Sequence, residues 1–122
     1  MKTIEIKKTL MGRGKAAVVL YIKYPVFAKF ESKIFEAKVN KYYKNLAAAF
    51  QKFAERELLK SALAADPEMP YSALLDFKIS DADDILRVQT IATVFTGEGR
   101  GETARRMRVW DKKSGTFLKV KN

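Results

Sequence analysis

The sequence predicts an α+β fold, in which one long amphipathic helix packs on an antiparallel sheet of about five or six strands, in the order β-β-α-β-β-β-β. Apolar residues largely alternate along the chain before residue 30 and after residue 70, as in strands. Between residues 32 and 65 they recur every three or four positions, as in a helix. The length of 122 residues suits one core, so residues 1–122 are expected to form a single domain.

The first two strands are expected to form a hairpin. Thr3–Met11 and Ala16–Phe27 are rich in β-branched and aromatic residues, and the glycines of Gly12–Lys15 between them favour a tight turn. Both alternating sets of residues in the second strand are largely apolar, which is typical of a central strand. Pro25 has no amide donor, so regular pairing is expected to weaken near the end of this strand.

Residues 32–65 are predicted to form the helix. Ser32 is a suitable N-cap, and Pro67 is expected to end the helix at Asp66, because proline disfavours helical geometry in the residue before it. Most of the basic side chains fall opposite the apolar stripe. The stripe is expected to be the core that covers the sheet, and it consists of Phe35, Val39, Tyr42, Leu46, Ala49, Phe50 and Phe53.

Four strands are expected after the helix. The segment Asp81–Asp84 is expected to turn the chain between the first two of them, and Lys112–Gly115 to turn it into the last. Alternation of apolar residues supports each strand. The expected ranges are Ala73–Ser80, Ile85–Thr96, Thr103–Trp110 and Thr116–Lys121.

The chain is strongly basic, with 24 lysines and arginines against 14 acidic residues and a net charge of +10. The basic residues concentrate in the first 30 residues and after residue 85, whereas residues 66–84 are acidic. Such a surface attracts nucleic acid, anionic lipid or an acidic protein through its long-range field, and it also keeps a small protein soluble. A basic nucleic-acid-binding protein is therefore one function that the composition leaves open.

The sequence contains no cysteine and no histidine. This excludes disulfides, thiolate nucleophiles, Cys/His zinc sites and histidine-based catalysis, and it leaves carboxylate, lysine, hydroxyl or backbone chemistry. Asp81, Asp83 and Asp84 lack the turn glycine and distal glutamate of a calcium loop, so a solvated turn is expected. No catalytic residue, metal ligand or cofactor site is predicted, and the protein is not expected to be an enzyme.

The N-terminal segment gives no targeting signal. Charged residues interrupt its apolar run, and the apolar segment Ala16–Ile22 is too short to span a membrane. As written, the chain is therefore expected to be cytoplasmic. A form that has lost a leader would be extracytoplasmic.

A glycine stands at every second position within the segment Phe95–Thr103. Gly97, Gly99 and Gly101 follow a strand, as in a phosphate-binding loop, but no Gly-Lys-Ser/Thr follows and the next segment alternates like a strand. We therefore expect these glycines to serve positive-φ or close-approach positions in a hairpin loop, with Arg100 at its tip.

Arg106, Arg108 and Trp110 alternate along the next strand and are expected to share one face. Cations beside an aromatic ring often build a surface for a protein, a glycan or a phosphate, although a solvated sheet face would have the same pattern. The candidate ligand or partner surface therefore consists of Gly97, Gly99, Arg100, Gly101, Arg106, Arg108 and Trp110.

Four segments resemble those of a known family. Tyr24–Phe27 closes a strand and Val39–Tyr43 lies in the helix. Phe95–Thr103 resembles the pattern Tyr-Thr-Gly-Gly-Ala-His-Gly-x-Thr, and Trp110–Gly115 resembles Trp-Asn-Leu-x-Thr-Gly. In order and spacing over roughly residues 20–120, the chain is similar to a bacterial domain of unknown function. That domain is found in the extracytoplasmic part of the anti-sigma factor RsiV, in the N-terminal region of the peptidoglycan deacetylase PdaC and in free-standing clostridial proteins.

The resemblance implies a helix laid on an antiparallel sheet and a non-catalytic role near the cell envelope; in RsiV this region senses lysozyme by binding it. Two features depart from the family. Gly99-Arg100 replaces the usual Ala-His, so any role of that histidine is absent. The family unit also continues beyond the last strand, so the chain is expected to be its N-terminal half.

The expected function is a binding or sensing module without catalysis, for a protein or a cell-wall glycan, and the alternative is a basic nucleic-acid-binding protein. A half-unit is expected to leave a strand edge or an apolar patch uncovered. A homo-oligomer is therefore expected, formed by edge pairing or by apolar surface around Tyr21, Phe95 and Trp110.

Overall fold

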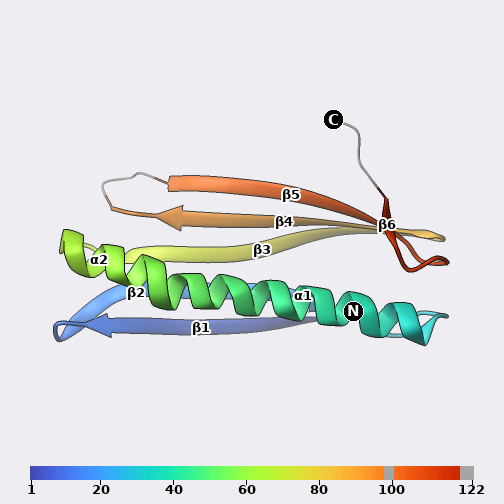
Figure 1. Cartoon of the computed structure of the whole chain (residues 1–122), viewed down its shortest axis with the longest axis horizontal. Helices are drawn as coiled ribbons and strands as arrows, with labels where there is room; N and C mark the ends of the chain where they lie inside the picture. The colour runs from blue at the N-terminus through green and yellow to red at the C-terminus, as the bar shows by residue number, and fades with distance from the viewer. Residues whose placement is uncertain (98–100, 119–122) are drawn as a thin grey trace.

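The computed structural model describes residues 1–97 and 101–118 of the chain. Five long strands and one two-residue strand make up the sheet (Figure 1): β1 (Lys2–Gly12), β2 (Lys15–Val26), β3 (Tyr71–Ala82), β4 (Ile85–Phe95), β5 (Gly101–Asp111) and β6 (Phe117–Leu118). The helical segment between β2 and β3 is continuous and consists of α1 (Lys33–Phe53), a π-helical turn η1 (Ala54–Leu58) and α2 (Leu59–Ala65).

The strands lie in the sheet in chain order, from β1 to β6. The predicted α+β fold with a helix on a sheet is confirmed, but the expectation of entirely antiparallel pairing was wrong, because β2 and β3 run parallel. The helical segment carries the chain back along the sheet, so β3 starts at the same end as β2. Of the predicted last strand, Phe117–Leu118 is present as β6, and residues 119–121 lie outside the described residues.

Local signals place both ends of the helical segment as expected. The Ser32 hydroxyl accepts a hydrogen bond from the Phe35 amide at 3.1 Å, which caps the first turn. Asp66 follows the last turn in the left-handed conformation, with φ of 46°, directly before Pro67. None of the helices in the described part of the chain is long and apolar enough to cross a membrane.

The buried face of the helical segment differs from the predicted stripe. Tyr42, Leu46 and Phe50 are only half-buried, Ala49 is exposed, and Phe53 is 41% exposed. The predicted stripe is therefore right for Phe35 and Val39 and wrong for Ala49 and Phe53. The three other members are partly buried and pack against the core clusters. The buried residues follow a row mostly four positions apart, which is inclined to the helix axis: Phe35, Val39, Tyr43, Ala47, Ala54, Leu58 and Ala62.

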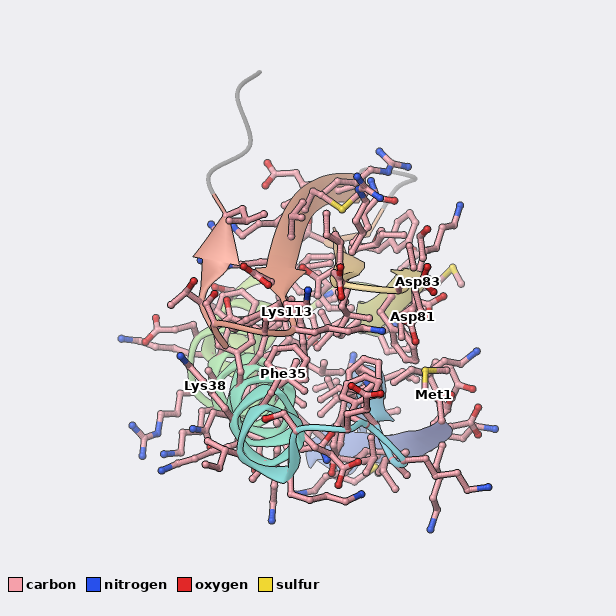
Figure 2. The ribbon with its side chains drawn as sticks, turned by 90° about the vertical axis from the view of Figure 1, so that its right-hand side faces the viewer. Met1, Phe35, Lys38, Asp81, Asp83 and Lys113 are labelled. Carbon is pink, nitrogen blue, oxygen red and sulfur yellow. The ribbon has the colours of Figure 1, made fainter. Side chains whose placement is uncertain are left out.

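The inclined row makes the helical segment cross the sheet diagonally. Its first half packs on β4 and β5, where Phe35, Val39 and Tyr43 belong to one cluster with Leu86, Val88 and Trp110. Its second half packs on the other strands, where Ala54, Leu58 and Ala62 cluster with Leu10, Val18 and Ala73. In Figure 1 the helical segment lies in front of β2, and β4 and β5 lie beside it. The end view in Figure 2 shows the helix against one side of the curved sheet only.

Candidate functional site

The predicted ligand surface lies along β5, whose side chains alternate between the two faces of the sheet. Trp110 pairs with Leu86, Arg108 with Val88 and Arg106 with Thr90. Because Leu86 and Val88 are buried beneath the helix, the face shared by the three predicted residues is the helix side.

Trp110 lies in the core. Its indole is 1% exposed, and its Nε1 donates a hydrogen bond to the Tyr43 hydroxyl at 2.9 Å. The rings of Tyr42 and Phe35 pack edge-on against it, with centroids 5.1 and 6.3 Å away. The expectation that Trp110 presents a ligand surface was therefore wrong, because the first half of α1 covers this part of the strand. Burial raises the pKa of the Tyr43 hydroxyl well above its usual range, so this group stays protonated in alkaline solution in which an exposed tyrosine would ionise.

The two arginines of the predicted surface have different surroundings. Arg108 is half-buried, and its Nε donates to the Tyr42 hydroxyl at 2.8 Å, so it is held against the helix. Arg106 lies one step nearer the uncovered end of β5, and its side chain is exposed. Of the three predicted β5 residues, Arg106 is therefore the one whose side chain is available to a ligand.

Arg106 borders a groove of about 320 Å³ between the helix and the uncovered part of the sheet. The floor has small side chains, among them Ala92 and Ala104, and this leaves room beside the larger side chains of α1. Sequence reasoning missed this site because it placed the helix-side members of the groove in the core. The groove is lined by Leu46, Ala49, Phe50, Leu75, Thr90, Ala92, Ala104 and Arg106.

At two of the predicted glycine positions the backbone favours glycine for the reasons that were expected. Gly97 has a φ of 84°, in the left-handed region that favours glycine. Gly101 pairs with Phe95 across β4 and β5, and a Cβ at Gly101 would lie 2.6 Å from the Phe95 ring. The Phe95 ring therefore lies directly over the glycine. Gly99 and Arg100 lie outside the described residues.

The sheet face opposite the helix carries exposed apolar side chains. Val19, Leu74 and Phe95 are 40%, 36% and 41% exposed, and Tyr21 lies beside Leu74 in the parallel pair. Tyr21 and Phe95, which were expected to contribute to an oligomer surface, thus lie on this face, whereas Trp110 lies on the other. Alternation along β2 and β3 identifies Val19 and Leu74 as further members.

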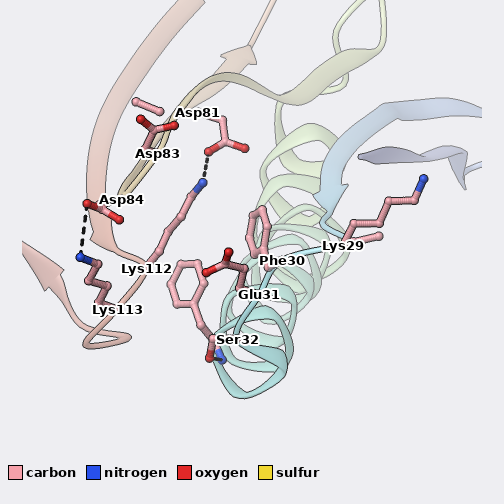
Figure 3. Close-up of a pocket in the computed structure, with 12 residues that line it drawn as sticks. Lys29, Phe30, Glu31, Ser32, Asp81, Asp83, Asp84, Lys112 and Lys113 are labelled. Carbon is pink, nitrogen blue, oxygen red and sulfur yellow. Dashed lines mark hydrogen bonds and ion pairs between the residues drawn. The ribbon is translucent and has the colours of Figure 1, made fainter.

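A second hollow, of about 760 Å³, lies at the opposite end of the sheet, beside the β3–β4 turn (Figure 3). Lys112 forms an ion pair with Asp81, and Lys113 Nζ lies 3.6 Å from Asp84 Oδ2. Lys112 Nζ also lies 5.1 Å from the Phe30 ring centroid. Asp81 and Asp84 of one turn thus form ion pairs with the two lysines of the other. These side chains are therefore less available to a partner than Arg106 in the groove. In the part of the chain that the structure describes, no group of three or more Asp or Glu side chains could hold a metal ion.

Comparison with known proteins gives one family and a shared fold. A family model described as deacetylase PdaC matches residues 13–103. A solved DUF3298 family protein from Pseudomonas aeruginosa PAO1 is 16% identical with a TM-score of 0.61, over 96% of this chain and 54% of that chain. A second member, from Bacteroides fragilis NCTC 9343, is 12% identical with a TM-score of 0.61, over 97% of this chain and 58% of that one. The chain thus spans little more than half the length of these proteins. The search of curated proteins found no significant match.

Proposed function

The chain belongs to the family described as deacetylase PdaC, and we propose that it acts as a binding module without catalysis, with a protein or a cell-wall glycan as its ligand. The binding surface is the groove beside the helix together with the adjoining end of β5. The family name describes a deacetylase. In our proposal this module binds a ligand and does not itself carry out deacetylation.

The observation that carries the proposal is the lining of the groove. A mostly apolar hollow with a few polar groups, here Thr90 and Arg106, is typical of a ligand site, because apolar contacts supply affinity and the polar groups fix orientation. Arg106 is the one ionisable side chain among the lining residues. A guanidinium stays protonated at any physiological pH, so it can bind a carboxylate or a phosphate but cannot act as an acid or a base.

Isothermal titration calorimetry tests this function. The purified chain is titrated with soluble peptidoglycan fragments and, separately, with proteins of the cell envelope, while acetate is measured in the same samples. We expect saturable binding without acetate release. Arg106→Ala should weaken binding, whereas Arg105→Ala, one residue away on the opposite face of β5, serves as the matched control.

Two outcomes would contradict the proposal. Acetate that accumulates with time in proportion to protein would show that the module is catalytic. Binding to nucleic acid that is tighter than binding to either ligand class, and that falls steeply as salt is raised, would show the alternative function, because counterion release governs phosphate-backbone contacts. Groove contacts are short-range and should depend on salt less.

A further inference from the structure

The helix leaves room for a second helix on its own side of the sheet. At the end of the sheet where β4 ends and β5 begins, five strands about 4.8 Å apart make a surface roughly 19 Å wide, whereas a helix is about 10 Å across. The groove beside α1 marks the uncovered area, over Thr90 and Ala92 of β4 and Ala104 and Arg106 of β5. On the helix side, the β4 residues here are half-buried and the β5 residues are exposed.

The dimensions of this area fit a short helix. Rising about 3.3 Å per residue, the strand from Thr90 to Phe95 is roughly 17 Å long, which a helix of about 11 residues would match. Packed helices approach to about 8–10 Å between axes when the side chains at the contact are small. Ala49 on the flank of α1, with Ala92 and Ala104 on the floor, provides such a contact.

The wall of the groove continues onto exposed aromatic surface. Phe53 is 41% exposed, and its ring lies 6.2 Å, between centroids, from that of Phe50, which lines the groove. An occupant with one apolar face would cover Phe50, Phe53 and Leu46 together. A helix with apolar residues at three- and four-residue steps presents such a face.

The positive charge at the groove favours an acidic partner. Arg106 stands at the strand side of the groove, and the whole chain carries a net charge of +10. An acidic helix would place a carboxylate against the guanidinium. Glu102, two positions beyond Ala104 on the same face, lies at the far end of the uncovered strand. The acidic residues of the partner therefore belong at the Arg106 end.

We propose that the groove binds an acidic amphipathic helix of a separate partner protein, laid beside α1 on the same face of the sheet. This inference rests on the proposed binding function and specifies the partner.

The test uses a designed probe. A fluorescein-labelled peptide of about 12 residues, built from Leu, Ala and Glu with its leucines on one helical face, is titrated with the full chain while anisotropy is recorded. Its controls are a scrambled peptide of the same composition and a peptide with Lys in place of Glu. We expect the acidic amphipathic peptide to bind in the micromolar range, and the controls at least about tenfold more weakly.

Three variants of the chain locate the binding site. Ala104→Trp fills the groove and Arg106→Glu reverses its charge, and each should weaken binding at least about tenfold. Arg105→Glu makes the same charge change on the opposite face and should alter affinity by less than about twofold. Circular dichroism confirms that each variant folds.

Equal affinity for the amphipathic and scrambled peptides, equal effects of Arg105→Glu and Arg106→Glu, or no binding up to about 1 mM would each overturn the inference. The helix partner and the proposed binding function can fail independently of each other. If the peptide fails while peptidoglycan fragments or an envelope protein still bind, the helix partner is wrong and the binding function remains. If nothing binds in either assay, the proposed function itself falls.

Discussion

Tyr43 fixes the single tryptophan of the chain in the core, because its hydroxyl accepts the indole N–H at 2.9 Å. Replacing Tyr43 with Phe removes this acceptor and keeps the ring. We expect a loss of about 1 kcal/mol in the free energy of unfolding, the usual net worth of one intramolecular hydrogen bond. Urea denaturation followed by tryptophan fluorescence measures it, and an unchanged midpoint would show that the bond does not contribute.

The same hydroxyl predicts a pH dependence. Burial raises the pKa of Tyr43 in the folded chain above the value of about 10 that tyrosine has when unfolded. The contribution of this group is therefore fully present below about pH 10 and is lost as the pH rises above that value toward the folded pKa. The free energy of unfolding should fall between pH 9 and pH 11 more steeply in the parent than in Tyr43→Phe. Parallel curves would contradict this.

The contact between Phe95 and Gly101 predicts a coupled pair. A methyl group at Gly101 would lie 2.6 Å from the Phe95 ring, so Gly101→Ala should force this partly exposed ring away and destabilise the fold by about 0.5–1.5 kcal/mol. In a Phe95→Ala background the same change should cost much less, because the clash is absent. A double-mutant cycle in urea measures the coupling, and additive effects would show that the ring moves aside freely.

At the scale of the helix, burial separates two apolar residues that the sequence pattern does not distinguish. Leu58 is 4% exposed within the core, whereas Phe53 is 41% exposed. Leu58→Ala should cost about 2–5 kcal/mol, because it leaves a cavity, whereas Phe53→Ala should cost under about 1 kcal/mol. Denaturant melts of the two variants test this. Similar losses would mean that Phe53 is covered in solution.

The sequence predicts a feature well when residues close by in the chain determine it, and less well when the packing of two distant elements determines it. The helix ends were predictable, because Ser32 and Pro67 act on their own neighbours. The buried row was not, since it follows from the diagonal crossing, which is a property of two packed elements. The same crossing decides that Trp110 is covered and Arg106 is open, although alternation correctly placed both on one face.

At the scale of the whole molecule, the sheet face opposite the helix carries exposed apolar side chains. We expect a homo-oligomer formed through Val19, Leu74 and Phe95, because exposed apolar patches mark interaction surfaces. Association should strengthen as salt is raised, since screening reduces the repulsion between chains of net charge +10.

Sedimentation at micromolar concentration measures this association, and Leu74→Lys, which places a charge in the centre of the face, should produce the monomer. A 13.9 kDa species for the parent at both low and high salt would show that the face remains free.

Among the described strands β2 and β3 form the one parallel pair, and this pair has a consequence for the order in which the chain folds. The strand pairs β1–β2 and β3–β4 close through short turns, whereas β2 and β3 bring Val18 opposite Tyr71 across the whole helical segment. Closing the longer loop loses more chain entropy before any contact forms in return. We therefore expect the two antiparallel units to assemble independently and early, and their joining along β2 and β3 to limit the folding rate.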